Sequence, residues 1–174
     1  MIRTKRLVLR ELQPADAQRI AALGGDWDVA SMTGRIPYPY SADAAQHWLA
    51  GVAAGEVVFA IDHLGELIGI CGYTPLDDGS AEMGYWLGKP YWGKGYATEA
   101  ARALINYGFG KGGVTRFTCS HFTDNPLSAR VVAKLGFRAV GLGKGWCEAR
   151  QQDLPALSYS RRRPWTSVIR ALAS

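Results

Sequence analysis

The central third of the chain carries a pattern that leaves few folds open to it. The apolar segment 81–88, AEMGYWLG, has the composition of a strand, and a turn with two glycines at 92–95, WGKG, joins it to the helix-forming segment 96–109. A second strand pattern, VTRFTCSHF at 114–122, follows at once. A strand, a helix and a strand in this order predict a parallel crossover, because parallel strands need a connection of about a dozen residues or more. The fold is therefore expected to contain a parallel pair covered by a helix.

The flanking segments predict antiparallel strands and further helices around that pair. Residues 6–11, RLVLRE, alternate like a half-buried strand, and Pro14 opens a helix that a glycine pair ends. Ser41 can cap a second helix, and the strands EVVFAID and LIGICGY are joined as a hairpin by HLGE. The other expected elements are a loop or broken helix at 26–40, a helix at 124–137, strands at 137–143 and 155–161, and a short helix at 164–173. Together they predict one domain, 1–174, with a mixed α/β sheet covered by helices.

Composition and charge narrow the classes of partner. Apolar residues make up 48% of the chain and charged residues 20%, as in folded globular proteins. The net charge of +5 suits an anionic partner. The only tight basic run, Arg161–Arg163, lacks the aromatic interleaving of a single-strand binder, so nucleic acid is the weakest alternative and is not expected as a partner. No segment resembles a signal peptide or a membrane span, so no membrane partner is expected.

Cysteine and histidine usage indicates compartment and metal content. The cysteines are odd in number, widely spaced and outside any C-x-x-C pattern, which is typical of reduced thiols in a cytoplasmic protein. They are Cys71, Cys119 and Cys147. With three histidines in the whole chain, a dedicated zinc site is not expected, and no metal is predicted.

The glycine turn at 92–95 is the strongest candidate for a binding site. Free N–H groups and the dipole at a helix N-terminus attract anions, and glycines let a phosphate approach the backbone. The turn is not a dinucleotide-binding fingerprint, because Thr98 stands where counting from Gly93 requires a third glycine. A plain strand-to-helix turn without a ligand is the alternative interpretation. If the turn binds phosphate, it does so as a phosphate site that differs from the dinucleotide-binding fingerprint.

Several motifs occur in an order that resembles a known family. WGKGYA at 92–97, with AEMGYWL before it and DNPLSARVVAKLGF after it, resembles the acetyl-CoA-binding core of the GNAT superfamily of N-acetyltransferases. The opening RLVLREL, the strand IGICGY, the N-x-x-S step and KLGF resemble in particular the ribosomal-protein alanine N-acetyltransferase-like branch, and the resemblance covers about residues 5–160. It implies a mostly antiparallel sheet with helices on both faces and a central parallel pair splayed around the coenzyme.

The resemblance also implies acetyl-CoA as co-substrate and assigns its contacts. In the family pattern (Q/R)-x-x-G-x-(G/A), Gly95 and Ala97 match, but Trp92 replaces Gln or Arg. The resemblance assigns the pyrophosphate contacts to the backbone of 93–98. It assigns the pantetheine arm to the strand edge at 85–87, where the arm would pair with the backbone like a missing strand. The cofactor-binding residues implied are Tyr85, Trp86, Leu87, Trp92, Gly93, Lys94, Gly95, Tyr96, Ala97, Thr98, Asn125 and Ser128.

Acetyl transfer needs a base, donors for the oxyanion and an acid for the departing thiolate. Glu82 resembles the base glutamate that several superfamily members keep on this strand, with His121 as its competitor and an exposed strand glutamate as the alternative interpretation. Ser128, by the N-x-x-S resemblance, is the implied acid or a group that orients the sulfur. Asn125 can both cap its helix and bind pantetheine. Direct attack in a ternary complex is expected, although Cys119 leaves a covalent route open.

The acceptor is expected to be a primary amine, either a protein N-terminus or a small molecule. The loop at 26–40 and the first helices would form the wall of its site, unless their aromatic residues belong to the core. The predicted substrate-binding residues are Trp27, Met32, Tyr38 and Trp48. The alternative function is a non-catalytic acyl-CoA-binding or sensor domain. A monomer or a homodimer is compatible with the sequence.

Overall fold

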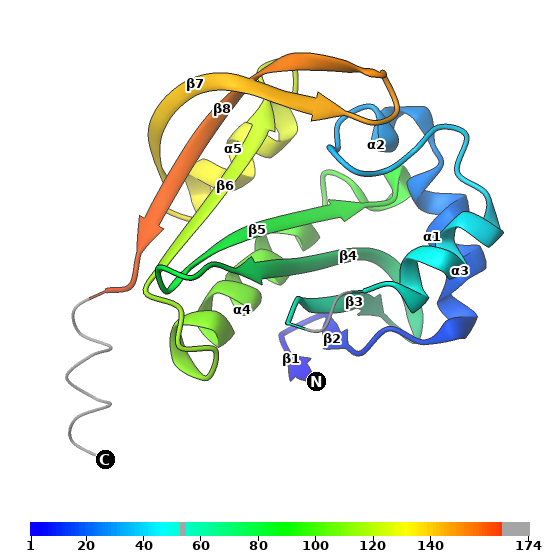
Figure 1. Cartoon of the computed structure of the whole chain (residues 1–174). Coiled ribbons are helices and arrows are strands. Elements are labelled where there is room, and N and C mark those ends of the chain that lie inside the picture. The colour runs from blue at the N-terminus through cyan, green and yellow to red at the C-terminus, as the bar shows by residue number, and fades with distance from the viewer. Residues whose placement is uncertain (53–54, 165–174) are drawn as a thin grey trace.

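An eight-stranded sheet runs through the computed structural model, which describes residues 1–52 and 55–164, in the strand order β1-β2-β3-β4-β5-β6-β8-β7 (Figure 1). The strands are β1 (Ile2–Arg3), β2 (Val8–Arg10), β3 (Val57–His63), β4 (Glu66–Pro75), β5 (Ser80–Leu87), β6 (Arg116–Phe122), β7 (Arg138–Cys147) and β8 (Gln152–Arg162). The helices are α1 (Ala17–Gly24), α2 (Trp27–Ala30), α3 (Ala42–Ala50), α4 (Tyr96–Gly110) and α5 (Pro126–Lys134), with 3-10 turns η1 (Pro14–Asp16) and η2 (Lys89–Tyr91). No helix within these ranges is both long and apolar enough to cross a bilayer. The short helix predicted at 164–173 falls outside the described residues except for Pro164.

The predicted parallel crossover is present and joins β5 to β6 through α4. The two strands share a short register, from Ser80–Arg116 to Glu82–Thr118, whereas the other neighbouring strands pair antiparallel. Beyond Glu82, β5 continues beside β4 while β6 continues beside β8, and the two halves of the sheet separate (Figure 1). A mostly antiparallel sheet with a splayed central parallel pair is thus confirmed.

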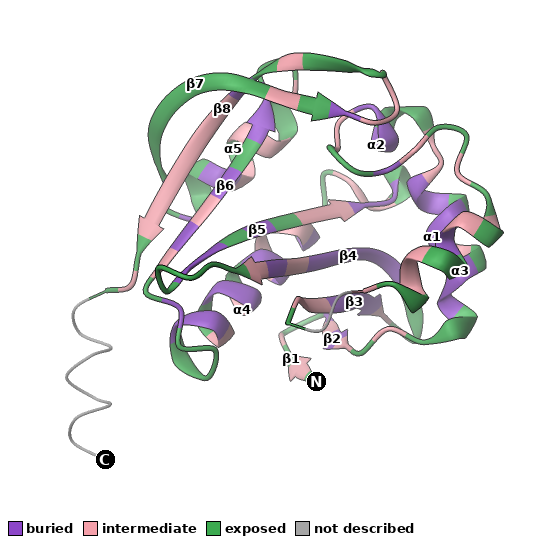
Figure 2. Cartoon of the chain, viewed as in Figure 1, coloured by how far each residue is buried: buried purple, intermediate pink, exposed green. Residues whose placement is uncertain are grey.

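Helices cover both faces of the sheet over separate apolar cores (Figure 2). On one face, α4 and α5 pack on a core that contains Leu104, Val132 and Phe117. On the other face, α1 and α3 pack on a smaller core that contains Ile20 and Ala45. The side chains of β5 alternate between these faces, as strand geometry requires. This alternation decides which side chains of β5 lie on each face of the sheet.

Local sequence signals mark several helix ends, since the predicted glycine pair ends α1 at Gly24, although Pro14 opens the 3-10 turn η1 and α1 begins only at Ala17. Ser41 Oγ accepts a hydrogen bond from the Ala44 N–H at 3.1 Å and caps α3. The loop or broken helix expected at 26–40 contains only the short α2. Strands β7 and β8 are longer than predicted, because they pair with each other from Arg138 to Cys147 despite the glycines in that stretch. Cross-strand pairing here outweighs the low strand propensity of glycine.

An ion-pair cluster around the partly buried Arg10 fastens the first helical turn to the sheet. Arg10 on β2 donates two hydrogen bonds to the carboxylate of Asp16, at 2.9 and 2.8 Å, and a third from Nε to Asp62 on β3, at 3.0 Å. Asp16 also accepts from the Gln13 N–H at 2.8 Å. The hydrogen bonds from Arg10 lower the pKa of Asp16 below its ordinary value, although burial opposes this shift. The ion pair therefore holds Asp16 ionised inside the fold.

The Arg10–Asp16 pair should make the stability of the protein depend on pH. A carboxyl group with a depressed pKa stabilises the fold above its unfolded pKa of about 3.9, and that contribution disappears as the pH falls through the folded pKa. Asp16→Asn should lower the free energy of unfolding by about 2 kcal/mol at pH 7, because Arg10 loses its two hydrogen bonds to a charged carboxylate and keeps only Asp62 as an ionic partner. Urea denaturation from pH 7 to pH 3 should show the gap between wild type and variant narrowing below about pH 4. The exposed Asp77→Asn is the control, and a gap that stays constant with pH would contradict the assignment.

Candidate active site

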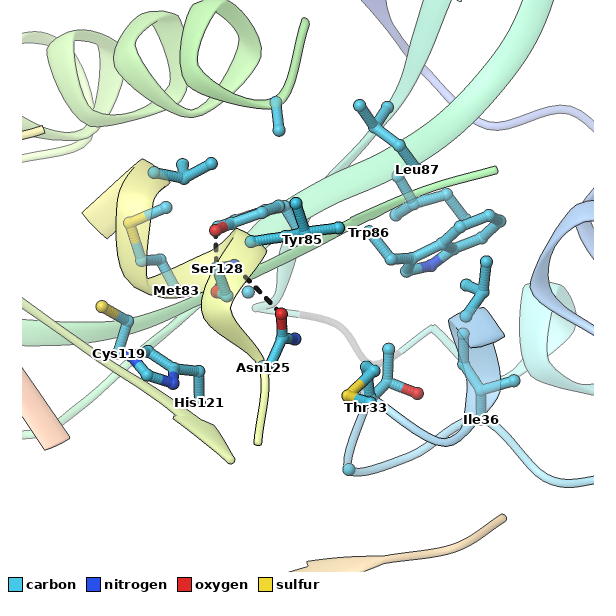
Figure 3. Close-up of a pocket in the computed structure, with 18 of the residues that line it drawn as sticks. Thr33, Ile36, Met83, Tyr85, Trp86, Leu87, Cys119, His121, Asn125 and Ser128 are labelled. Carbon is cyan, nitrogen blue, oxygen red and sulfur yellow. Dashed lines mark hydrogen bonds between the residues drawn. The ribbon is translucent and has the colours of Figure 1, made fainter. Parts of the chain in front are cut away.

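A groove of about 1160 Å³ opens where β5 and β6 diverge. Its walls come from β5, the start of α4, the start of α5 and the loop that follows α2, and Figure 3 shows several of these side chains. Pockets for single small ligands usually have about 300–1,000 Å³. The groove is therefore large enough for an extended ligand together with a second reactant.

The glycine turn before α4 presents free backbone donors to this groove. Gly93 and Gly95 have φ angles of 74° and 80°, in the left-handed region that glycine adopts without strain. Within the described part of the chain, the N–H groups of residues 93–98 donate to no other residue. They lie at the N-terminus of a 15-residue helix, whose dipole adds to their attraction for an anion. The turn has the geometry expected of a phosphate site.

Arg6 braces the glycine turn from the N-terminal strands. Its Nη1 donates to the Lys94 carbonyl at 2.9 Å, and its guanidinium pairs with Glu99 at 2.7 Å. The same guanidinium lies 4.6 Å from the centre of the Tyr96 ring. Thr4 adds a hydrogen bond to Glu99 at 2.7 Å. Sequence reasoning missed these residues, because contacts across some 90 positions leave no local signal.

Trp92, which departs from the family pattern, ties the turn back to the strand before it. Its indole N–H donates to the Leu87 carbonyl at 2.7 Å. One of the backbone acceptors predicted at the strand edge 85–87 is therefore already occupied, and the edge that remains for a ligand lies nearer Tyr85. A glutamine or arginine is not needed to hold the turn, since the indole fixes its start.

Two hydroxyl groups meet on the α5 side of the divergence (Figure 3). The Tyr85 hydroxyl on β5 lies 2.9 Å from Ser128 Oγ in the first turn of α5. The Ser128 N–H donates to Asn125 Oδ1 at 3.0 Å, so the predicted helix cap is present and fixes the position of Ser128. Burial is the main cause that raises the pKa of Tyr85 to about 12, so its hydroxyl is protonated at neutral pH. Sequence reasoning placed Tyr85 here for its backbone and missed its hydroxyl.

Glu82 and His121, the two candidate bases, occupy different environments. Glu82 is exposed in the groove, between Thr74 on β4 and Thr118 on β6, and its carboxylate forms no hydrogen bond or ion pair with another described residue. His121 is buried, with Nδ1 2.8 Å from the Phe122 carbonyl and Nε2 3.1 Å from the Tyr159 hydroxyl. Because the fold engages both ring nitrogens of His121, the geometry favours Glu82 as the group open to a substrate proton.

Cys119, the candidate for a covalent route, is buried beside Glu82. Burial raises its pKa to about 12, and the negative charge of Glu82 contributes to the same shift. The nucleophile in thiol chemistry is the thiolate, which such a group does not form near neutral pH. The environment of Cys119 therefore favours direct attack over a covalent enzyme intermediate.

The structure divides the four residues predicted to bind the acceptor. Met32 and Trp48 line the groove. Trp27 and Tyr38 are absent from its lining, are about half exposed, and pack edge to face with ring centres 5.0 Å apart. Two further aromatic residues of the lining are Tyr40, from the loop after α2, and Trp146, from the end of β7, which sequence reasoning missed.

One side of the groove is closed by two segments that are distant in the sequence. The loop after α2 runs alongside the end of β7, where the Cys147 thiol lies 3.5 Å from the Ser31 carbonyl and 3.4 Å from the Thr33 carbonyl. The Glu148 N–H donates to the Gly34 carbonyl at 3.1 Å. The loop and the β7–β8 hairpin thus form one wall.

Comparison with known proteins identifies relatives of this chain. Residues 6–138 match the family model described as an acetyltransferase (GNAT) domain. An uncharacterised N-acetyltransferase of Bacillus licheniformis is 29% identical over 166 residues, which cover 90% of this chain and 93% of the relative. The ribosomal-protein-serine acetyltransferase of Escherichia coli is 34% identical over 89 residues, which cover 50% of this chain and 48% of the relative.

Solved structures share the fold. The ribosomal-protein α-N-acetyltransferase RimL, solved in complex with coenzyme A, superposes with a TM-score of 0.80 and 18% identity. The match covers 91% of this chain and 95% of that one. At this identity the likeness concerns the arrangement of strands and helices alone.

Loss of the Asn125 cap should destabilise α5 and release Ser128. Asn125→Ala should lower the free energy of unfolding by about 1 kcal/mol, because the Ser128 N–H loses its acceptor. Asn125→Asp keeps an acceptor oxygen and should retain most of the stability. Urea denaturation of the three proteins measures the difference, and equal stability of wild type and Asn125→Ala would show that the cap contributes nothing.

Proposed function

The chain belongs to the GNAT family of acetyl-CoA-dependent N-acetyltransferases, and we propose that its acceptor is the α-amino group of a protein N-terminus. The observation that carries the proposal is the unpaired carboxylate of Glu82 in a groove that extends to exposed residues such as Trp146. A peptide can enter such a groove by its end while the rest of its chain stays outside. Support also comes from relatives whose names specify ribosomal-protein acetylation.

The free donors of the glycine turn fit the phosphates of the coenzyme. Acetyl-CoA supplies the acetyl group as a thioester. The N–H groups of 93–98 would hold its pyrophosphate, with the charge of Lys94 nearby. The backbone of Tyr85 would pair with the pantetheine arm. Because Asn125 Oδ1 is engaged in the cap, its amide N–H₂ is the part left to bind a ligand carbonyl.

Glu82 and Ser128 would act from opposite sides of β5. A peptide α-amino group has a pKa of about 8, so at neutral pH it must lose a proton before it can attack. Glu82 would accept that proton, directly or through a water molecule. The side chains of Tyr85 and Glu82 leave β5 on opposite faces, so Ser128 would meet the sulfur on the side away from the base. Proton removal and thiolate departure are thus assigned to separate groups. A cytoplasmic location is part of this proposal.

Placing a negative charge in the glycine turn should weaken coenzyme binding. Gly95→Glu would change the backbone as well as the charge, since Gly95 has a φ of 80°. Thr98→Glu is cleaner, because an acid in the first helical turn favours the helix while it repels phosphate. Calorimetry should show affinity for acetyl-CoA reduced by about tenfold or more. Asn106→Glu, exposed farther along α4, is the matched control, and unchanged affinity in Thr98→Glu would contradict the phosphate assignment.

Removal of the candidate base should abolish most turnover without loss of coenzyme binding. Glu82→Gln should lower kcat by about 10²-fold or more at pH 7, as expected for loss of general base catalysis. The substrates are peptides with a free N-terminus, the same peptides with a blocked N-terminus and an internal lysine, and spermidine, with products identified by mass spectrometry. Acetylation at the free α-amino group supports the proposed acceptor. Turnover confined to lysine or spermidine would overturn it.

A further inference from the structure

In the hydrogen bond between the hydroxyls of Tyr85 and Ser128, the choice of donor decides where the Ser128 proton points. We propose that Tyr85 is a positioning residue, which donates to Ser128 and so turns the Ser128 O–H toward the departing thiolate. This inference rests on the proposed function for the reaction that it serves. It adds a residue that acts through Ser128 and need not touch the coenzyme.

The two residues are fixed by independent parts of the fold. Tyr85 leaves β5 beyond the last residue that pairs with β6, on the face covered by α5. Ser128 is held through its own backbone, because its N–H is bound to Asn125 Oδ1 at 3.0 Å. The 2.9 Å contact between the two hydroxyls therefore joins two rigid elements across the widening groove, as Figure 3 shows.

The proton in this contact belongs on the tyrosine. A hydroxyl group donates one hydrogen bond and can accept two. Within the described residues, Tyr85 has no other hydrogen-bond partner for its hydroxyl, and a phenol is a stronger donor than an aliphatic alcohol. When Tyr85 donates, Ser128 Oγ accepts, and the Ser128 proton is left free to point into the groove. Such a chain of donors also strengthens each of its hydrogen bonds.

The Ser128 donor would be used when the thioester splits. The ammonium proton that Glu82 takes before attack passes on to solvent water, to which this exposed carboxylate is open. The nitrogen–carbon bond then forms, the carbon–sulfur bond breaks with its electron pair going to sulfur, and the second proton of the nitrogen goes to Glu82. No proton leaves Ser128 or Tyr85, which only stabilise the negative sulfur by hydrogen bonding. The other titratable or charged groups that β5, β6, α5 and the residues just before α5 bring to the groove lining are Glu82, Cys119, His121, Asp124, Arg130 and Lys134, and Asp124 is paired with Arg150. Cys119 is held as a neutral thiol and His121 is engaged by the fold.

The test titrates the thiol of coenzyme A bound to the protein and requires no acceptor. Ultraviolet difference absorbance reports the bound thiolate as the pH is raised. Tyr85→Phe should raise the midpoint by about one pH unit, because a hydrogen bond to a charged sulfur is weakened. Ser128→Ala should raise it at least as far, and the double variant should add nothing to Ser128→Ala. Turnover of Tyr85→Phe should fall by about tenfold with the acceptor KM unchanged.

Controls separate this role from a general structural effect. Tyr107→Phe removes a hydroxyl from α4 away from the groove and should leave the midpoint at the wild-type value. If Tyr85→Phe proves unstable, Ser128→Thr, which keeps a hydroxyl donor, should leave the midpoint close to the wild-type value, in contrast to Ser128→Ala. Equal midpoints in wild type, Tyr85→Phe and Ser128→Ala would overturn the inference. A shifted midpoint with no acetylation of any peptide would instead leave the inference intact and remove the proposed acceptor.

Discussion

The separation of β5 from β6 is the constraint on which the site depends. The strands share a short parallel register that ends at Glu82, and beyond it each keeps its antiparallel partner on the outer side. A sheet that divides in this way exposes backbone groups at its centre instead of at its edge. The same separation brings the Tyr85 side chain against α5 and leaves Glu82 open on the opposite face. The groove, the candidate base and the hydroxyl pair thus have one common origin.

Close approaches at two glycines hold α4 and β4 against the central strands. A Cβ atom added to Gly108 on α4 would lie 2.3 Å from the Phe117 ring on β6, so only glycine allows the helix to pack this near the strand. On the other side of β5, a Cβ atom at Gly69 would lie 2.2 Å from the Trp86 carbonyl. These contacts fix α4 and β4 against the central pair, and they place the glycine turn at the mouth of the groove.

Local chemistry made much of the fold predictable, whereas the site depended on contacts that no local pattern encodes. The caps at Ser41 and Asn125, the hairpin and the crossover helix follow from signals within a few residues. By contrast, Tyr85 and Ser128 lie 43 positions apart, so their contact depends on where two elements meet in space. The wall formed by the loop after α2 shows the same limit, because Tyr38 lies at the surface whereas Tyr40, two residues later, lines the groove.

The link between the loop after α2 and the end of β7 bears on how acceptor preference can change in this scaffold. Cys147 and Glu148 contact backbone carbonyl oxygens of the loop, and the loop presents these oxygens whatever side chains it carries. Side chains can therefore vary while the two segments stay joined, but a change in loop length would displace the hairpin too. During divergence of such enzymes, insertions on this side are expected to evolve in both segments together. Transplanting only the loop or only the hairpin into a related enzyme would therefore not transfer the acceptor preference in full.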